Sequence, residues 1–182
     1  MKTYKTEGIV LRRRNFGEAD RILTVLSRDL GKITVKAPGV RRIFSRRSPH
    51  VELLNFSHFT IYKSSKTFMP IVTEVQTLED FAFIKSNLHK AGLALYLCEL
   101  VNGLCADNQE NRGVFFHLKN TFFEFSRVSE VEKLVKKFEK NLLMELGFWS
   151  EAELLQTHDS QIVMENLLEK KLKTLRITPL FV

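Results

Sequence analysis

Hydrophobic and polar positions follow two different periods along the chain, and the change between them falls near residue 78. In the first part, short runs of β-branched and aliphatic residues are separated by turn residues, which is typical of strands. Ile33 and Val35 alternate with Lys32, Thr34 and Lys36, the pattern of a strand with one buried and one basic face. Five strands are predicted, over residues 6–13, 21–27, 31–37, 52–63 and 69–78.

After residue 78 the apolar positions recur with helical spacing. Three stripes recur every three or four residues and predict three helices, each with one apolar face. They are Leu93, Leu97, Leu100 and Leu104; Phe115, Leu118, Phe122 and Phe125; and Val131, Val135, Phe138 and Leu142. Ser129 is predicted to cap the third of these helices, and Gly147 to end it. Phe116 and Phe123 widen the second stripe, and we expect them in the core. The alternative is that they form an exposed apolar face that binds a groove of a partner protein. A last helix is predicted over residues 160–175.

The two periods predict an α+β protein. Five short strands with a long connection after the third fit a small closed or nearly closed barrel better than an open sheet, and an OB-fold is the matching architecture. We therefore predict an N-terminal OB-fold β-barrel over residues 1–78 and an α-helical domain over residues 79–182. No run of eighteen apolar residues and no secretory signal are present, so a cytoplasmic protein is expected.

The charge of the chain is divided unevenly between these parts. Residues 1–78 hold fifteen Lys and Arg against six acids, a net charge of +9, whereas residues 79–182 carry −2. All the excess positive charge therefore lies in the predicted barrel. An asymmetry of this kind indicates a polyanionic partner for that part of the chain.

The densest positive charge is the arginine segment, residues 39–50, which reads "GVRRIFSRRSPH". Guanidinium groups match phosphate oxygens in geometry and stay charged at any working pH. A solvated basic loop is the alternative. However, no acid lies between Leu30 and Val51, so full internal pairing is not expected. We predict that the segment binds phosphates through Arg41, Arg42, Arg46 and Arg47.

Further cations on the predicted strands extend this basic surface. Alternate strand residues point to opposite faces, so Arg12 and Arg14 share a face that Arg13 does not. We expect nucleic-acid contacts from Arg12, Arg14, Arg21, Lys32 and Lys36; solubility or edge protection is the alternative reading. Two aromatic residues among the arginines, Phe16 and Phe44, are candidates for base stacking.

Signals for catalysis or metal binding are poor. Gly31 and the lysine after it resemble the end of a phosphate-binding loop, but Leu26 and Ile33 stand where that motif needs a glycine and a Ser or Thr. The histidines lack metal-ligand spacing, and Cys98 and Cys105 lie seven apart on a predicted buried helix, which favours packed thiols. We expect no enzyme, no cofactor and no metal site.

Residues 8–47 resemble the N-terminal domain of the RecO family of bacterial DNA repair and recombination mediators. The resemblance rests on the order and spacing of several short pieces and is specific over about residues 5–60. The pieces are Gly8-Ile9-Val10-Leu11, Glu18-x-Asp20, the strand over 23–27, Gly31-Lys32, Lys36-Ala37-x-Gly39-x-Arg41-Arg42 and Ser45-Arg46. Many members carry a four-cysteine zinc motif in the helical part, and this chain resembles a short member that lacks it.

The resemblance implies a non-enzymatic protein that binds single- and double-stranded DNA, anneals complementary strands and helps load the recombinase RecA onto coated strands. It implies RecR and the C-terminal tail of single-stranded DNA-binding protein as partners, and a nucleoid-associated place in the bacterial cytoplasm. Glu18 and Asp20 are then landmarks of the fold. Two other readings stay open: an adaptor whose basic barrel docks an acidic protein tail, and an RNA-binding OB protein.

Overall fold

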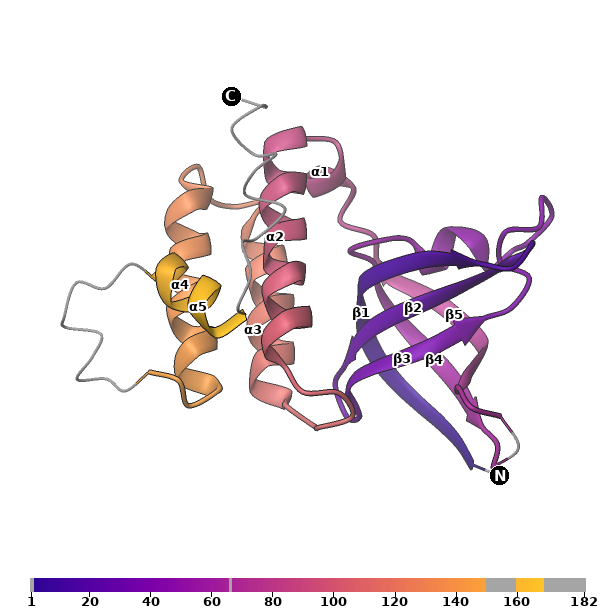
Figure 1. Ribbon diagram of the computed structural model, residues 1–182. Helices are drawn as coiled ribbons and strands as arrows, with labels where there is room; N and C mark the ends of the chain where they lie inside the picture. The colour runs from indigo at the N-terminus through magenta and orange to yellow at the C-terminus, as the bar shows by residue number, and fades with distance from the viewer. Residues whose placement is uncertain (1, 66, 150–159, 169–182) are drawn as a thin grey trace. The chain divides into compact units, whose positions relative to one another are not determined.

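The computed structural model of the chain describes residues 2–65, 67–149 and 160–168, and its elements form two compact units (Figure 1). The first, here called the barrel unit, contains residues 1–80 together with residues 106–115. The second, the helical unit, contains residues 81–105 and continues from residue 116. The chain therefore leaves the barrel unit, forms a short and a long helix and returns before it builds the remaining helices.

The barrel unit contains five strands: β1 (Lys2–Phe16), β2 (Asp20–Ser27), β3 (Gly31–Ala37), β4 (Phe56–Lys63) and β5 (Ile71–Glu79). Their pairing in the order β1-β2-β3-β5-β4 closes the sheet into a barrel. Every pair is antiparallel except β3 and β5, which run parallel and meet at the single residue pair Lys36 and Ile71. An N-terminal OB-like barrel followed by helices confirms the predicted α+β class.

Side chains of alternate strand residues fill the barrel. Val10, Leu23, Val25, Val35 and Phe59 are each fully buried in this core, as the alternation along the strands predicts. Strand β1 pairs with two strands along its length: its first half pairs with β4 and its second half with β2. A register shift between Val10 and Arg12 marks the change.

One predicted strand starts later than the sequence indicates. Residues 52–55 precede β4 in a turn, after a short 3-10 helix over Ser48–Val51. Leu54 has φ of 69°, and its N–H donates to the carbonyl of Val10, whose own N–H donates to the carbonyl of Asn55. These bonds hold the turn against β1 at its register shift, so the apolar Leu53 and Leu54 do not extend the strand.

The helical unit contains α1 (Ala82–Lys85), α2 (Leu88–Leu104), α4 (Val131–Glu145) and α5 (Ser160–Leu168), while α3 (Arg112–Glu124) begins in the segment that belongs to the barrel unit. The predicted apolar stripes are buried, except that Leu104 is half-buried.

Gly147, with φ of 75°, follows the end of α4 as predicted. The prediction for Ser129 was wrong, since Glu130 occupies the N-cap without a side-chain hydrogen bond. Phe116 is 44% exposed, so the core prediction fails for it. The predicted last helix is described only to Leu168.

The interior of the helical unit contains a carboxylate with hydrogen-bond donors around it. Glu139 is buried, and its carboxylate accepts hydrogen bonds from the Tyr96 hydroxyl at 2.6 Å and from the Ser160 hydroxyl. Such donors stabilise a polar group in an apolar interior. No helix within the described residues has the length and apolarity needed to cross a membrane.

Gly31 allows residues 106–110 to lie along β3. Its φ is 68°, and a Cβ atom there would lie 1.8 Å from the carbonyl oxygen of Gln109. Beside it, Asn108 N–H donates to the carbonyl of Lys32 at 2.8 Å. The returning segment thus covers the start of β3, where only a residue without a side chain fits.

We expect Gly31→Ala to lower the free energy of unfolding of the barrel unit by more than about 2 kcal/mol, because strain at positive φ adds to displacement of the segment. Gly17→Ala is the matched control, since Gly17 has φ of 56° and nothing within 4 Å of the added Cβ; it should cost about 1 kcal/mol. Urea denaturation of both variants measures this. Equal losses would show that the close approach of Gln109 contributes nothing.

Candidate nucleic-acid interface

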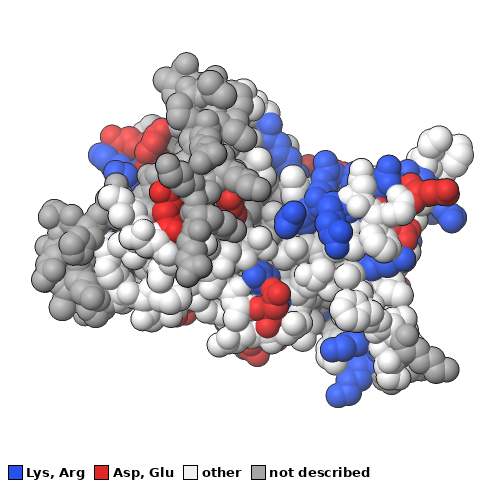
Figure 2. Space-filling model, viewed as in Figure 1, with Lys and Arg blue, Asp and Glu red and all other residues white. Residues whose placement is uncertain are grey.

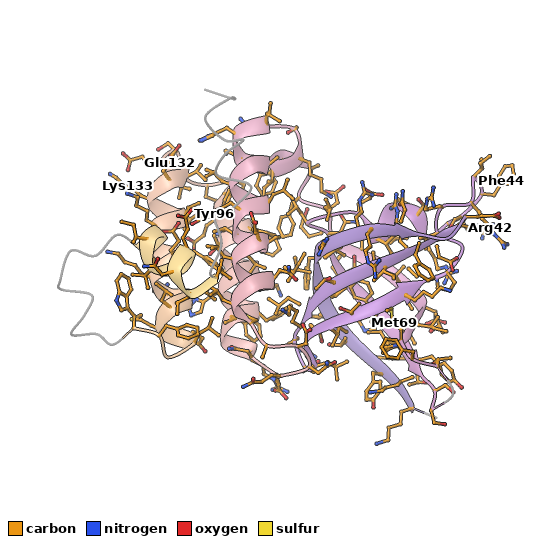
Figure 3. All side chains as sticks on the ribbon, in the orientation of Figure 1. Arg42, Phe44, Met69, Tyr96, Glu132 and Lys133 are labelled. Atoms are coloured by element: carbon orange, nitrogen blue, oxygen red, sulfur yellow. The ribbon has the colours of Figure 1, made fainter. Side chains whose placement is uncertain are left out.

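The arginine segment is anchored in the barrel core near each end and exposed between these anchors. Val40 and Val51 are buried in the barrel core. Between them, the side chains of Ile43 and Phe44 are 93% and 94% exposed. Figure 3 shows Arg42 and Phe44 on the loop that projects from the barrel. The segment therefore presents an apolar tip among cations, on a base that the core holds in place.

Asp20 ties the arginine segment to the turn between β1 and β2. Its carboxylate accepts hydrogen bonds from Gly39 N–H and from Lys36 Nζ, both at 2.8 Å. Arg41 reaches the same turn and donates to the carbonyl of Gly17 at 3.0 Å. Gly39, with φ of 68°, shapes the turn that brings its N–H to Asp20. Asp20 is thus a structural anchor, in keeping with the role of fold landmark expected for it.

The four arginines of the segment have different surroundings. Arg47 donates to the carbonyls of Pro38 at 2.7 Å, Val72 at 3.0 Å and Thr73 at 3.3 Å, so its guanidinium holds the segment against β5. Arg42 and Arg46 are exposed and form no ion pair with any described residue. Arg41 is also exposed but differs from these two by its hydrogen bond to the carbonyl of Gly17.

Strand β1 separates its arginines as alternation predicts. Arg13 and Arg21 both contact the carboxylate of Glu52, the latter at 2.8 Å. The Arg21 side chain is only 16% exposed, and within the described chain its Nε has no hydrogen-bond partner. Arg12 and Arg14 point to the other face and are exposed. Neither is ion-paired to a residue that the structure describes.

The two lysines of β3 lie against acidic groups. Lys32 is buried, and its Nζ lies 3.1 Å from a carboxylate oxygen of Asp107. Lys36, bound to Asp20, also has its Nζ 5.2 Å from the centre of the Phe16 ring. Phe16 remains 45% exposed. The β3 lysines therefore support local structure first.

The nine predicted cations thus divide into two groups. Arg21, Lys32, Lys36 and Arg47 are engaged inside the barrel unit, whereas Arg12, Arg14, Arg41, Arg42 and Arg46 are exposed. Figure 2 shows groups of Lys and Arg over the barrel unit on the face in view. The charges counted along the sequence do not reveal that Glu52 and Asp107 pair with some of these cations. Glu52 follows the acid-free stretch directly and gives a weak signal, while Asp107 comes from a distant part of the chain and gives none.

No group of three His, Cys, Asp or Glu residues in the described parts of the chain has a geometry that could hold a metal ion. Cys98 and Cys105 are buried free thiols. Burial raises the pKa of the Cys98 thiol well above its ordinary range, which disfavours the thiolate that metal binding needs.

Comparison with known proteins identifies the family. Residues 1–81 match the family described as "Recombination protein O N terminal", and residues 85–150 match "Recombination protein O C terminal". The chain belongs to the RecO family. The resemblance read from residues 5–60 is confirmed, and the match extends into the helical part of this chain.

Curated relatives agree with this assignment. A protein named "DNA repair protein RecO" from Dehalococcoides mccartyi is 35% identical over 145 residues, which is 80% of this chain and 56% of the relative. Proteins of the same name from Roseiflexus sp. and Pelotomaculum thermopropionicum are each 33% identical, over 81% of this chain and 51% and 57% of the relatives. The chain therefore spans about half the length of the RecO relatives it matches.

The Asp20 anchor makes a pH-dependent contribution to the stability of the barrel unit. The hydrogen bonds from Lys36 and Gly39 hold the pKa of Asp20 below its ordinary value of 3.8. Such a group adds stability that is fully present above the ordinary pKa and is lost as pH falls through the lowered one. Asp20→Asn should therefore unfold at lower temperature near neutral pH and lose less stability in acid than the wild type does.

Thermal unfolding midpoints measured from neutral pH to about pH 2 test this expectation. Glu18→Gln, in the same turn but exposed, should follow the wild-type curve. A residual acid loss is expected in Asp20→Asn, because the hydrogen bond from Arg28 also lowers the pKa of Asp29. An Asp20→Asn curve that declines as steeply as the wild type would contradict the anchor.

Proposed function

We propose that this RecO-family chain is a DNA repair and homologous recombination mediator. In this role it binds single- and double-stranded DNA without catalysis, anneals complementary strands and helps load RecA onto coated single strands. Family membership and the printed name of the curated relatives support the repair role. The observation that carries DNA binding is the set of exposed arginines around an exposed apolar tip.

The exposed arginines suit phosphate contacts. Each neutralised phosphate releases condensed counterions, which adds about 0.7 to the slope of log affinity against log salt for a single strand. Arg12, Arg14, Arg42 and Arg46 would contribute a slope of about 3, with Arg41 adding to it. The engaged group, including Arg47, contributes by holding the loop and strands in place.

The loop tip suits contacts with bases. Aromatic rings stack on successive bases of a single strand with little sequence preference. Phe44 is almost fully exposed and lies between Arg42 and Arg46 along the chain, so phosphate and base contacts come from neighbouring residues. Phe16 is less accessible, because Lys36 lies over its ring. We propose Phe44 as the main stacking residue and Phe16 as a secondary one.

Annealing follows from the same charges. Two complementary strands repel each other through their phosphates, and a surface that neutralises part of both lowers that repulsion. The bases can then meet without a chemical step by the protein. We assign this work to the predicted N-terminal domain, residues 1–78, and partner docking to the predicted helical domain, residues 79–182.

Helix α4 supports the docking role. Lys133, Lys136, Lys137 and Lys140 line a hollow of about 400 Å³ together with Asn141 and Met144. Lys133 is paired with Glu130 at 2.6 Å, whereas the other three lysines are not paired with described acids. Lysine stems supply apolar walls, and their ammonium groups supply positive charge. This combination fits the acidic tail of single-stranded DNA-binding protein; RecR, the other proposed partner, has no assigned surface.

Replacing Arg42 and Arg46 together by Ala should weaken binding of a labelled single-stranded oligonucleotide and reduce its salt slope by about 1.4. Arg47 stays unchanged, because its loss would release the loop from β5. Fluorescence anisotropy across a salt series, under identical conditions for each variant, measures both quantities.

Lys136→Ala with Lys137→Ala is the matched control, since it removes the same charge from the helical unit. It should leave the slope near that of the wild type. If both double variants lose slope equally, binding follows net charge and the arginine segment is not a site. If the wild type binds a matched RNA more tightly than DNA, contacts to 2′-hydroxyl groups are indicated and the RNA alternative leads.

In a peptide-binding measurement the lysine double variant becomes the test and the arginine double variant becomes the control. Lys136→Ala with Lys137→Ala should weaken binding of a labelled acidic tail peptide, because α4 loses two of its three unpaired lysines, while Arg42→Ala with Arg46→Ala should not. Competition with an unlabelled oligonucleotide completes the measurement. The contrary result is that Arg42→Ala with Arg46→Ala weakens peptide binding and that the oligonucleotide displaces the peptide from the wild type. That result would favour the alternative in which the basic barrel itself docks the acidic tail.

A further inference from the structure

The mouth of the barrel at the beginning of β1 holds a cavity that the arginine segment does not share. Its volume is about 320 Å³, near the lower end of the range for small-molecule pockets. Apolar walls come from Ile33, Val35 and Ile61, and the aromatic ring of Tyr4 joins them. In Figure 1 the N-terminus, where β1 begins, lies at the lower end of the barrel, and Figure 3 shows Phe44 toward the upper end.

The mouth is open beside β3, because β3 and β5 hardly pair. Strand β5 meets β3 only at the pair Ile71 and Lys36, and on that side Lys32 forms one isolated bridge with Asp107. Asn108 and Glu110 come from the returning segment and line the rim. The cavity is therefore lined on one side by side chains of β3 and β4 that belong to the barrel core.

Positive charge at this mouth lacks a counterpart. Lys2 and Lys63 lie directly opposite each other in the β1–β4 ladder, and like charges in that position destabilise a strand pair. Both are exposed, and neither is ion-paired to a described residue. Lys2 lies two positions before Tyr4 on β1, and Lys63 lies two positions after Ile61, the residue opposite Tyr4 on β4. Both lysines therefore lie on the same face of the sheet as Tyr4. An anion bound between the two lysines would relieve their repulsion.

The acids at the rim do not cancel this charge, because arginines already neutralise them. Asp29 accepts from Arg28 and Arg112 at 3.2 Å each, and Glu110 lies 2.8 Å from Arg112. Their carboxylate oxygens remain acceptors for further N–H groups. Asn108 adds an amide with a donor and an acceptor. The rim thus offers polar groups able to pair with the edge of a heterocyclic base.

From these features we infer that the barrel mouth binds a nucleotide. The base enters the cavity beside Tyr4, and Asn108 with the rim carboxylates pairs with its edge. The phosphate lies at Lys2 and Lys63. Carboxylates accept from the amino group of cytosine, and an Asn amide pairs with adenine, so bases with an exocyclic amino group fit best. The nucleotide is either free or part of a DNA strand. This site is separate from the arginine segment and does not rest on the proposed function.

Isothermal titration calorimetry of the full chain with dCMP, deoxycytidine and inorganic phosphate tests the site. We expect dCMP to bind more tightly than either component alone. Lys63→Gln should weaken dCMP binding about tenfold through loss of a charge-assisted contact. Lys5→Gln is the matched control, because Lys5 is an exposed lysine of β1 on the face opposite Tyr4; it should bind as the wild type does.

A second titration separates the two sources of the nucleotide. If dCMP binds and a single-stranded oligonucleotide does not displace it, the ligand is a free nucleotide; displacement that depends on Lys63 but not on Lys5 assigns the site to a strand. Arg42→Ala with Arg46→Ala should bind dCMP normally, which keeps this test independent of the arginine segment. Phosphate that binds as tightly as dCMP, or equal effects of Lys63→Gln and Lys5→Gln, would overturn the inference.

Discussion

Arg47 joins two strands that hardly pair with each other. Strands β3 and β5 meet at only one residue pair, and the guanidinium of Arg47 spans them through the carbonyls of Pro38, Val72 and Thr73. Hydrogen bonds from a charged donor to carbonyls are stronger than those between neutral groups. The same side chain therefore links the residue after β3 to β5 and holds the arginine segment in place. A cation that looks free in the sequence is therefore part of the framework that presents its neighbours.

The fold could be predicted where local pattern and burial agree. Alternation in β3 and the leucine stripe of α2 each identify their element, because one face of each is buried in a core. Prediction failed where a long-range contact decides the backbone. Residues 52–55 read as a strand, but hydrogen bonds to Val10 hold them in a turn. Residues 106–110 carry no local sign that they return to β3, since the close approach at Gly31 is a property of both segments together.

The candidate interface could be predicted in kind but not in detail. Residue type and density identified a basic surface around residues 39–50, and alternation placed Arg12 and Arg14 on one face. Which cations are engaged depends on Glu52, Asp107 and backbone carbonyls, and these partners are distant in sequence. Net charge thus indicates the class of partner, whereas the number of usable contacts follows from the tertiary structure. Half of a basic cluster can serve the barrel and leave the other half for a ligand.

The two buried thiols have a consequence for how this protein can be studied. Cys98 and Cys105 are both buried, and buried cysteines in apolar surroundings are inert compared with exposed ones. A cysteine introduced at an exposed position would therefore react with a maleimide dye well before either native one. Fluorophores could be attached at chosen points of the barrel loops without first removing any native residue, so the position of the arginine segment could be followed one molecule at a time.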